Sequence, residues 1–203
     1  MVTIIDYGMG NLRSVQKACQ KLGYEAVISD RSEEILRAQA VILPGVGAFE
    51  QAMHRLKSTG LDKTVLRTAD RGTPLLGICL GMQLMFRSSS EGGLHKGLGL
   101  IKSDIRQFKS GVKVPHMGWN TIIPQNNALF EGIKPDSYVY FVHSFCAPEI
   151  NSAWTGAVCD YNGPFSAAAA QGNVFATQFH PEKSGDVGLR ILENFLKMGA
   201  AEC

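Results

Sequence analysis

Residues 74–83 read Pro-Leu-Leu-Gly-Ile-Cys-Leu-Gly-Met-Gln, and this stretch decides the fold class of the chain. An apolar run passes through Gly77, Cys79 and Gly81 into a helical pattern, which is the nucleophile-elbow arrangement with cysteine in place of serine. A residue on a sharp turn from strand to helix needs glycine on both flanks, because its strained backbone leaves little room for neighbouring side chains. We therefore predict that Cys79 lies at a helix N-terminus, where the helix dipole favours the thiolate. Taken alone, the pattern also fits a buried structural cysteine between two packing glycines.

Upstream of this elbow, short β-branched runs alternate with helical patterns. Asn11 is a good N-cap for the first helical pattern, and Gly23 stands where a left-handed C-cap is expected. Alternation of this kind predicts a parallel sheet with helices on both faces. The expected strands are 2–6, 26–29, 40–43 and 75–79, and the expected helices are 12–22, 33–37, 49–57 and 61–71.

Downstream of the elbow, glycine-rich turns separate short strand-like runs, so mixed or antiparallel pairing is expected. We predict an α/β fold in one domain spanning residues 1–203, with a central, mostly parallel mixed sheet flanked by helices. The expected strands in this part are 112–114, 138–143, 167–171 and 174–179, and a last helix is expected over 187–197.

Composition narrows the class of protein. Among 203 residues, 20 Lys and Arg nearly balance 18 Asp and Glu, so no net charge draws the surface toward nucleic acid or an acidic membrane. The start of the chain lacks the pattern of a signal peptide, and no apolar run approaches the ~20 residues that span a bilayer. We expect a cytoplasmic protein with reduced thiols and no zinc site, because the five cysteines are scattered and form no CxxC pair: Cys19, Cys79, Cys146, Cys159 and Cys203.

A second candidate for chemistry is His180-Pro-Glu182, which follows an apolar run. Proline restricts the residue before it to extended conformations, and side chains two apart on an extended chain point the same way. Glu182 can then reach the His180 ring and fix its tautomer, which is the arrangement that a cysteine nucleophile needs in its base. The alternative is a surface His-Pro-Glu turn.

The third candidate is the loop Leu43-Pro-Gly-Val-Gly-Ala-Phe49, where a strand ends in a glycine-rich turn before a helical pattern. Such a turn can present backbone N–H groups to a developing oxyanion. A phosphate-binding loop is a competing interpretation, but the chain has neither a P-loop motif nor a Rossmann glycine fingerprint. An ordinary tight loop is the remaining alternative.

Together, the three candidates resemble the class I, triad-type glutamine amidotransferases, whose catalytic order is Cys, His and Glu. The resemblance is most specific to the glutaminase subunits of imidazole glycerol phosphate synthases, and its motifs extend from residue 6 to residue 184. They are Asp6-Tyr-Gly-Met-Gly-Asn-Leu12, Pro44-Gly-Val-Gly-Ala-Phe49, Gly77-Ile-Cys-Leu-Gly-Met-Gln83, Pro115-His-Met-Gly-Trp-Asn120, Tyr140-Phe-Val-His-Ser144 and His180-Pro-Glu-Lys-Ser184.

The resemblance implies roles for individual residues. Cys79, His180 and Glu182 would be catalytic, and the backbone amides of Val46 and Leu80 would form the oxyanion hole. Glutamine would be held by Gly47, Gln83 and the backbone around Ser144 and Phe145, where many relatives are expected to carry tyrosine, so only a backbone role carries over to Phe145. The partner would dock on a face that carries Asn11, Trp119, Asn120, Tyr140 and Lys183. For His116 and His143, structural or interface roles are expected.

The implied reaction releases ammonia from L-glutamine and needs no metal and no organic cofactor. The implied partner is the (β/α)8-barrel cyclase subunit of imidazole glycerol phosphate synthase, in a heterodimer that takes part in histidine biosynthesis. Two alternatives stay open. One is the glutaminase of another synthase, such as the one that makes pyridoxal phosphate, and it lacks the Pro-His-Met-Gly-Trp-Asn run. The other is a catalytically silent module that regulates a cyclase, against which the intact Cys, His and Glu set argues.

Overall fold

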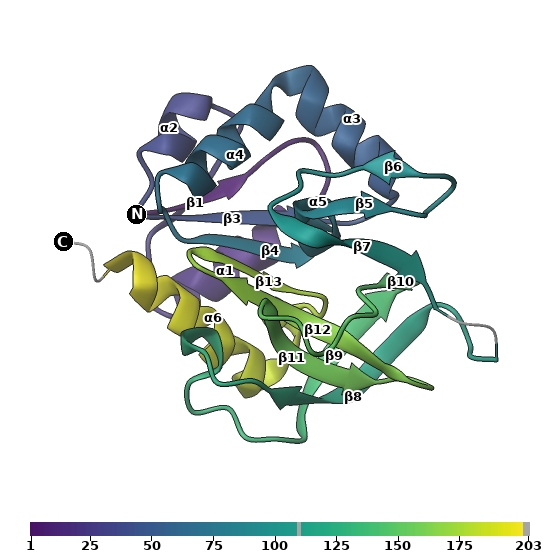
Figure 1. Ribbon diagram of the computed structural model, residues 1–203. Helices are drawn as coiled ribbons and strands as arrows, with labels where there is room; N and C mark the ends of the chain where they lie inside the picture. Colours follow the sequence, from purple (N-terminus) through teal and green to yellow (C-terminus); the bar gives the residue numbers. More distant parts are fainter. Residues whose placement is uncertain (109–110, 201–203) are drawn as a thin grey trace.

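The computed structural model describes residues 1–108 and 111–200, so Cys203 lies outside the described residues. Nine strands form a central sheet with the order β2-β1-β3-β4-β13-β12-β11-β8-β9 (Figure 1). The strands are β1 (Val2–Ile5), β2 (Ala26–Ser29), β3 (Ala40–Gly45), β4 (Leu75–Cys79), β8 (His116–Pro124), β9 (Ser137–His143), β11 (Thr155–Asp160), β12 (Pro164–Gln171) and β13 (Val174–Thr177).

The central sheet has two halves that differ in strand direction. From β2 to β13 every neighbouring pair is parallel, and from β13 to β9 every neighbouring pair is antiparallel. The halves follow the sequence, because helices connect the strands before the elbow and short turns connect most of those after it. The predicted α/β fold with a mixed central sheet flanked by helices is confirmed, but four of the eight neighbouring pairs are antiparallel, so the sheet is not mostly parallel as predicted.

Helices cover both faces of the parallel half (Figure 1). One face packs against α1 (Leu12–Lys21) and α6 (Gly185–Ala200). The other packs against α2 (Ser32–Leu36), α3 (Phe49–Thr59), α4 (Leu61–Asp70) and α5 (Leu80–Met85). Strands β1, β3 and β4 are buried along their whole length, which explains their continuous apolar runs, whereas the edge strand β2 is only partly buried. In the part of the chain that the structure describes, no helix is long and apolar enough to cross a membrane.

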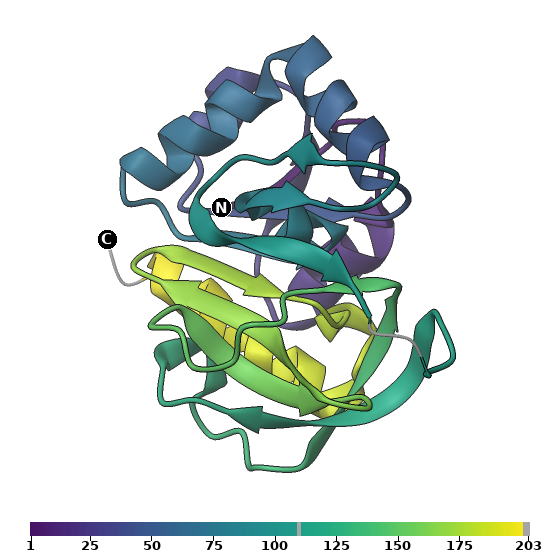
Figure 2. The same ribbon diagram turned by 45° about the vertical axis from the view of Figure 1, so that its right-hand side comes forward.

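A second, smaller sheet has four strands in the order β10-β7-β5-β6 (Figure 2). Its members are β5 (Phe86–Ser89), β6 (His95–Lys96), β7 (Ile101–Gln107) and β10 (Phe145–Cys146). Because β10 follows β9 after a single residue, the chain leaves the central sheet at Ser144 and joins the small sheet at Phe145. The two sheets therefore meet at this corner.

The first helices and strands agree with the prediction to within a few residues, but two details differ. Asn11 occupies the N-cap position of α1 without a capping side-chain hydrogen bond, whereas Gly23 has the expected positive φ of 85°. The predicted strand 112–114 is wrong. Val114 is 39% exposed, and pairing begins only at His116, after Pro115, which has no N–H to donate.

Strands β8 and β9 expose one face to solvent. Trp119 pairs with Tyr140 across the two strands, and their rings meet edge to face at 6.0 Å. Side chains alternate along a strand, so Met117, Trp119 and Ile123 share one face, and Tyr138 and Tyr140 continue it on β9. Trp119 is 56% exposed and Tyr138 is 60% exposed. We call these five residues the outer β8–β9 surface.

Candidate active site

Cys79 stands at the end of β4, where the chain turns directly into α5. Its backbone φ is 55°, a positive value that residues other than glycine rarely adopt. Added Cβ atoms show why glycine flanks it. One at Gly81 would collide with the Leu43 carbonyl on β3, and one at Gly77 would lie 2.8 Å from the backbone of Gly81. The turn from strand to helix at Cys79 is thus the one that the sequence predicts.

His180 and Glu182 form a buried pair. His180 Nδ1 lies 2.8 Å from the Glu182 carboxylate, and their side chains are 3% and 1% exposed. His180 is extended as expected, but Glu182 lies in a 3₁₀ turn, η2 (Pro181–Lys183), rather than on an extended chain. The reach of the carboxylate is therefore as predicted, while the backbone that provides it is not.

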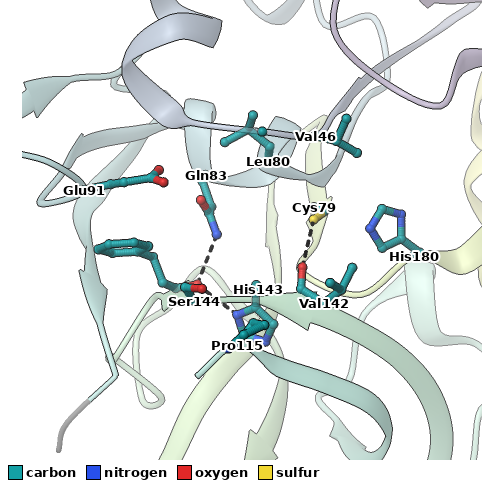
Figure 3. Close-up of a pocket in the computed structure, with 12 residues that line it drawn as sticks. Val46, Cys79, Leu80, Gln83, Glu91, Pro115, Val142, His143, Ser144 and His180 are labelled. Carbon is teal, nitrogen blue, oxygen red and sulfur yellow. Dashed lines mark hydrogen bonds between the residues drawn. The ribbon is translucent and has the colours of Figure 1, made fainter. Parts of the chain in front are cut away.

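The surroundings of His180 favour a charged imidazole. Burial lowers the pKa of His180, but the Cys79 thiol and the Glu182 carboxylate outweigh burial and raise that pKa from 6.5 to about 9. Nε2 of the ring is buried without a hydrogen-bond partner among the described residues. Figure 3 shows this ring beside the Cys79 sulfur. The free ring nitrogen can accept a proton or, in the charged ring, donate one.

A cavity of about 390 Å³ joins the candidate residues. The Cys79 thiol lies at its wall, where it donates to the Val142 carbonyl at 3.8 Å (Figure 3). The sulfur also accepts from Gln178 Nε2 at 3.9 Å. Nine residues were predicted as catalytic, oxyanion-stabilising or glutamine-binding, and all of them except Glu182 line this cavity. These eight are Val46, Gly47, Cys79, Leu80, Gln83, Ser144, Phe145 and His180.

Four further residues line the cavity but were not predicted from the sequence to do so: Glu91, Pro115, Val142 and His143. Glu91 carries the only carboxylate among the lining residues. One of its oxygens accepts from the Phe49 N–H at the start of α3, at 2.9 Å. Glu91 lies in a glycine-rich loop without hydrophobic periodicity, so only its negative charge beside Gly92 and Gly93 could have indicated it.

The glycine loop after β3 reaches the mouth of the cavity. Val46 is 42% exposed, and Gly47 has a φ of 99°, which favours glycine. A side chain at Gly45 would collide with the Tyr7 hydroxyl, a buried group with no hydrogen-bond partner among the described residues. Glycines on both sides of Val46 leave its peptide groups able to reorient at low cost.

Four of the five predicted docking residues belong to segments that are linked by packing contacts. Trp119 and Tyr140 belong to the outer β8–β9 surface, η2 with Lys183 packs against β9, and α1, which Asn11 precedes, packs against η2. Asn120 differs, because its side chain turns to the opposite face of β8 and donates to the Asp160 carbonyl at 2.9 Å. A side-chain contact between Asn120 and a partner on the outer surface is therefore not supported by this geometry.

Comparisons with known proteins agree with this geometry. The family model for glutamine amidotransferase class-I matches residues 3–198. Imidazole glycerol phosphate synthase subunit HisH of Moorella thermoacetica is 49% identical over 196 residues, covering 96% of this chain and 93% of the relative. The subunit of the same name from Methanosarcina barkeri is 52% identical over 201 residues, covering 97% and 98%.

A solved crystal structure of a glutamine amidotransferase has the same fold. The two structures superpose with a TM-score of 0.78 at 20% sequence identity, and the match covers 98% of this chain and 100% of the other. The match of the family model over nearly the whole chain and the two close relatives lead to one conclusion. The chain belongs to the class-I glutamine amidotransferases, among the relatives named imidazole glycerol phosphate synthase subunit HisH.

Proposed function

We propose that this chain hydrolyses L-glutamine and delivers the ammonia to the cyclase subunit of an imidazole glycerol phosphate synthase in histidine biosynthesis. The observation that carries the proposal is the elbow cysteine in one cavity with a histidine whose Nδ1 is held by a buried carboxylate at 2.8 Å. This is the arrangement of a cysteine nucleophile with its base and orienting acid. Residues 1–203 act in this proposal as one domain.

The first half of the reaction forms a thioester. The Cys79 thiolate attacks the carboxamide carbon of glutamine, and the Leu80 and Val46 amides stabilise the oxyanion. Leu80 N–H begins α5, so the helix dipole adds to this stabilisation. The C–N bond breaks as His180 gives its Nε2 proton to the departing nitrogen, and ammonia leaves.

The second half restores the enzyme. Water attacks the thioester carbonyl while His180 Nε2 takes a proton from it, and the C–S bond breaks to give glutamate and the Cys79 thiolate. Throughout, the Glu182 carboxylate stabilises the imidazolium and keeps Nδ1 protonated. The protein's own residues thus supply every group that the hydrolysis requires.

Glutamine carries charges that the cavity can recognise. The Glu91 carboxylate provides a negative charge for the α-ammonium group of glutamine. The hydrogen bond that this carboxylate accepts from the Phe49 N–H, at the start of α3, holds it in place. Gln83 is fixed by donating to the Phe145 carbonyl at 3.0 Å and to the Gln178 side chain at 2.9 Å. The backbone of Ser144 and Phe145 faces the same cavity and would bind the α-carboxylate.

The partner would dock on the outer β8–β9 surface. Its exposed Trp119 and Tyr138 are residue types that often dominate the energy of an interface. Ammonia becomes useless to an acceptor once it is protonated in bulk water, so a docked (β/α)8-barrel cyclase would give it a sheltered path. Val142 lines the cavity and also pairs with Met117 of the outer β8–β9 surface, which supports a short path for ammonia from the cavity to this surface.

Copurification with candidate synthase subunits, followed by a product assay, tests the function. With the matching cyclase, glutamine should support formation of imidazole glycerol phosphate at a rate matched by glutamate release. Binding to a different synthase with glutamine-dependent synthesis of its product would assign the chain to that enzyme. Binding without any glutamate release would identify a silent regulatory module.

The isolated chain should be a poor glutaminase. If the Val46 amide is turned away from the oxyanion in the free chain, the loss of one donor lowers the rate by roughly 10² to 10³. Docking of the cyclase with its nucleotide ligand would favour the competent turn by binding it more tightly. Glutamate release should be measured for the chain alone, with partner, and with partner plus ligand.

Trp119→Ala should remove most of the stimulation by the partner, because the exposed ring leaves the outer β8–β9 surface while the core stays intact. Lys197→Ala on α6, an exposed change outside this surface, is the control and should keep the full response. Full glutaminase activity of the isolated wild-type chain would refute the gating of Val46 and leave the role of Cys79 untouched.

A further inference from the structure

A chain of hydrogen bonds runs from strand β8 to the wall of the cavity. The Asn120 side-chain amide contacts His116 Nε2 at 3.2 Å, and His116 Nδ1 contacts His143 Nε2 at 3.0 Å. His143 Nδ1 then contacts the Phe145 carbonyl at 2.8 Å. That carbonyl also accepts from Gln83 Nε2 at 3.0 Å. Glutamine hydrolysis as proposed above uses neither histidine.

The direction of every bond in this chain follows from its last acceptor. A backbone carbonyl only accepts, so His143 must carry its proton on Nδ1. If the ring is neutral, its Nε2 is an acceptor, and His116 must donate from Nδ1. His116 Nε2 then accepts from the side-chain N–H₂ group of Asn120. The side-chain oxygen of Asn120 accepts from the Thr121 N–H at 2.8 Å, which fixes the orientation of the amide.

Both rings are kept neutral by their surroundings. Burial lowers the pKa of His116 to about 4 and that of His143 to about 3. The His116 ring stacks against Tyr161 at 4.0 Å and against Phe141 at 4.7 Å between ring centroids, and these contacts restrict its movement. A proton added to His143 would place two N–H groups against each other. The direction of donation is therefore fixed from Asn120 to Phe145.

The end of this chain lies where the two sheets meet. Ser144 and Phe145 form the corner between β9 and β10 and line the cavity. With His143 and Gln83 both donating to it, the Phe145 carbonyl has a fixed orientation, and the adjoining backbone is fixed with it. On the side of the small sheet, this corner pairs with β7 at two positions among the described residues, Phe145 with Gln107 and Cys146 with Arg106.

We propose that His116 and His143 are positioning residues, both neutral with the proton on Nδ1, which hold the Ser144–Phe145 backbone in the geometry that binds glutamine. They act through the Phe145 carbonyl and touch no reacting atom. Asn120 fixes the tautomer of His116 from strand β8, whose other face carries Trp119. The kinetic part of this inference rests on the proposed glutaminase function.

The tautomers can be measured without any activity. In the full-length chain labelled with ¹⁵N-histidine, long-range ¹H–¹⁵N spectra near neutral pH should show Nδ1 of both rings protonated and Nε2 of both rings unprotonated. Single His116→Asn and His143→Asn variants assign the signals. A proton on Nε2 of either ring, or a doubly protonated ring, overturns the proposal.

Glutamine kinetics with the cyclase partner present test the positioning. His116→Leu removes the donor to His143 and should raise KM for glutamine about 2- to 10-fold with kcat changed less than about twofold, the range expected for one lost hydrogen bond. His116→Asn places an amide N–H where Nδ1 stood and should restore KM to within about twofold of wild type. Ammonium-dependent synthesis should be the same in all variants.

Phe108→Leu is the matched control for loosened packing. The Phe108 ring centroid lies 5.1 Å from that of His143 and 6.1 Å from that of His116, and this side chain takes no part in the hydrogen bonds. It should lower the melting temperature and leave KM unchanged. An unchanged KM in His116→Leu, or equal KM values in the Leu and Asn variants, would overturn the positioning role. Failure of the proposed function is recognised separately, by glutamate release that does not depend on Cys79.

Discussion

Cys79→Ala should abolish glutamine-dependent synthesis, with a loss of roughly 10⁶ in rate, as when the nucleophile of a catalytic triad is removed. Among the described residues, Cys79 carries the only thiol that lines the cavity. Synthesis from added ammonium should continue, because the partner's chemistry does not use this thiol. Parallel assays with glutamine and with ammonium, on the complex, measure both rates.

Three other cysteines provide matched controls. Burial raises the pKa of Cys19, Cys146 and Cys159 to about 12, so these thiols stay protonated and unreactive at neutral pH. Their single replacements by alanine should affect stability at most. Retention of glutamine use by Cys79→Ala, or its loss in one of the controls with an intact fold, would contradict the assignment of the nucleophile.

Glu182→Gln should slow glutamine hydrolysis by roughly 10⁴, less than the loss for Cys79→Ala. The amide is close to the carboxylate in size, so the fold should persist, but it carries no charge to stabilise the imidazolium of His180. It can also hold the ring in the wrong tautomer, because its N–H₂ group can donate to Nδ1, 2.8 Å away. Single-turnover glutamate release, with the melting temperature as a check on folding, measures the effect.

Glu193→Gln is a suitable control for the loss of a carboxylate. Glu193 pairs with Lys197 at 2.9 Å on the surface of α6, and an exposed ion pair contributes little to stability. Activity of this variant should equal that of wild type. If Glu182→Gln also turned over glutamine at the wild-type rate, the His-Pro-Glu segment would be only a structural turn.

The parallel half of the fold was predictable because β1, β3 and β4 are continuous buried apolar runs that alternate with helical patterns. The strands β8 and β11 were missed because polar residues and glycines break their patterns, and only pairing within the sheet makes them strands. The run 112–114 has two β-branched valines, Val112 and Val114, yet it finds no partner strand in the described structure. Local preference for a strand therefore failed where tertiary pairing decides.

The candidate site was predictable where one short motif holds the necessary chemistry. Cys79 with its glycines, and His180 with Glu182, are local patterns that the structure brings into contact. Glu91 was missed because its role depends on a loop that folds back over α3. The pairing of His116 with His143 depends on the register between β8 and β9, which no local pattern reveals.

The turn that carries His180 also closes the edge of the central sheet. Strand β9 is the last strand, and an open edge is a template for unwanted pairing with another chain. At Tyr140 the carbonyl accepts from the His180 N–H at 3.0 Å, and the N–H donates to Ser184 Oγ at 2.9 Å. Both backbone bonding groups of Tyr140 are therefore already occupied and cannot pair with a foreign strand. The turn that carries the proposed catalytic base thus also covers part of this sheet edge, and we expect a mutation that loosens the turn to lower solubility together with glutamine hydrolysis.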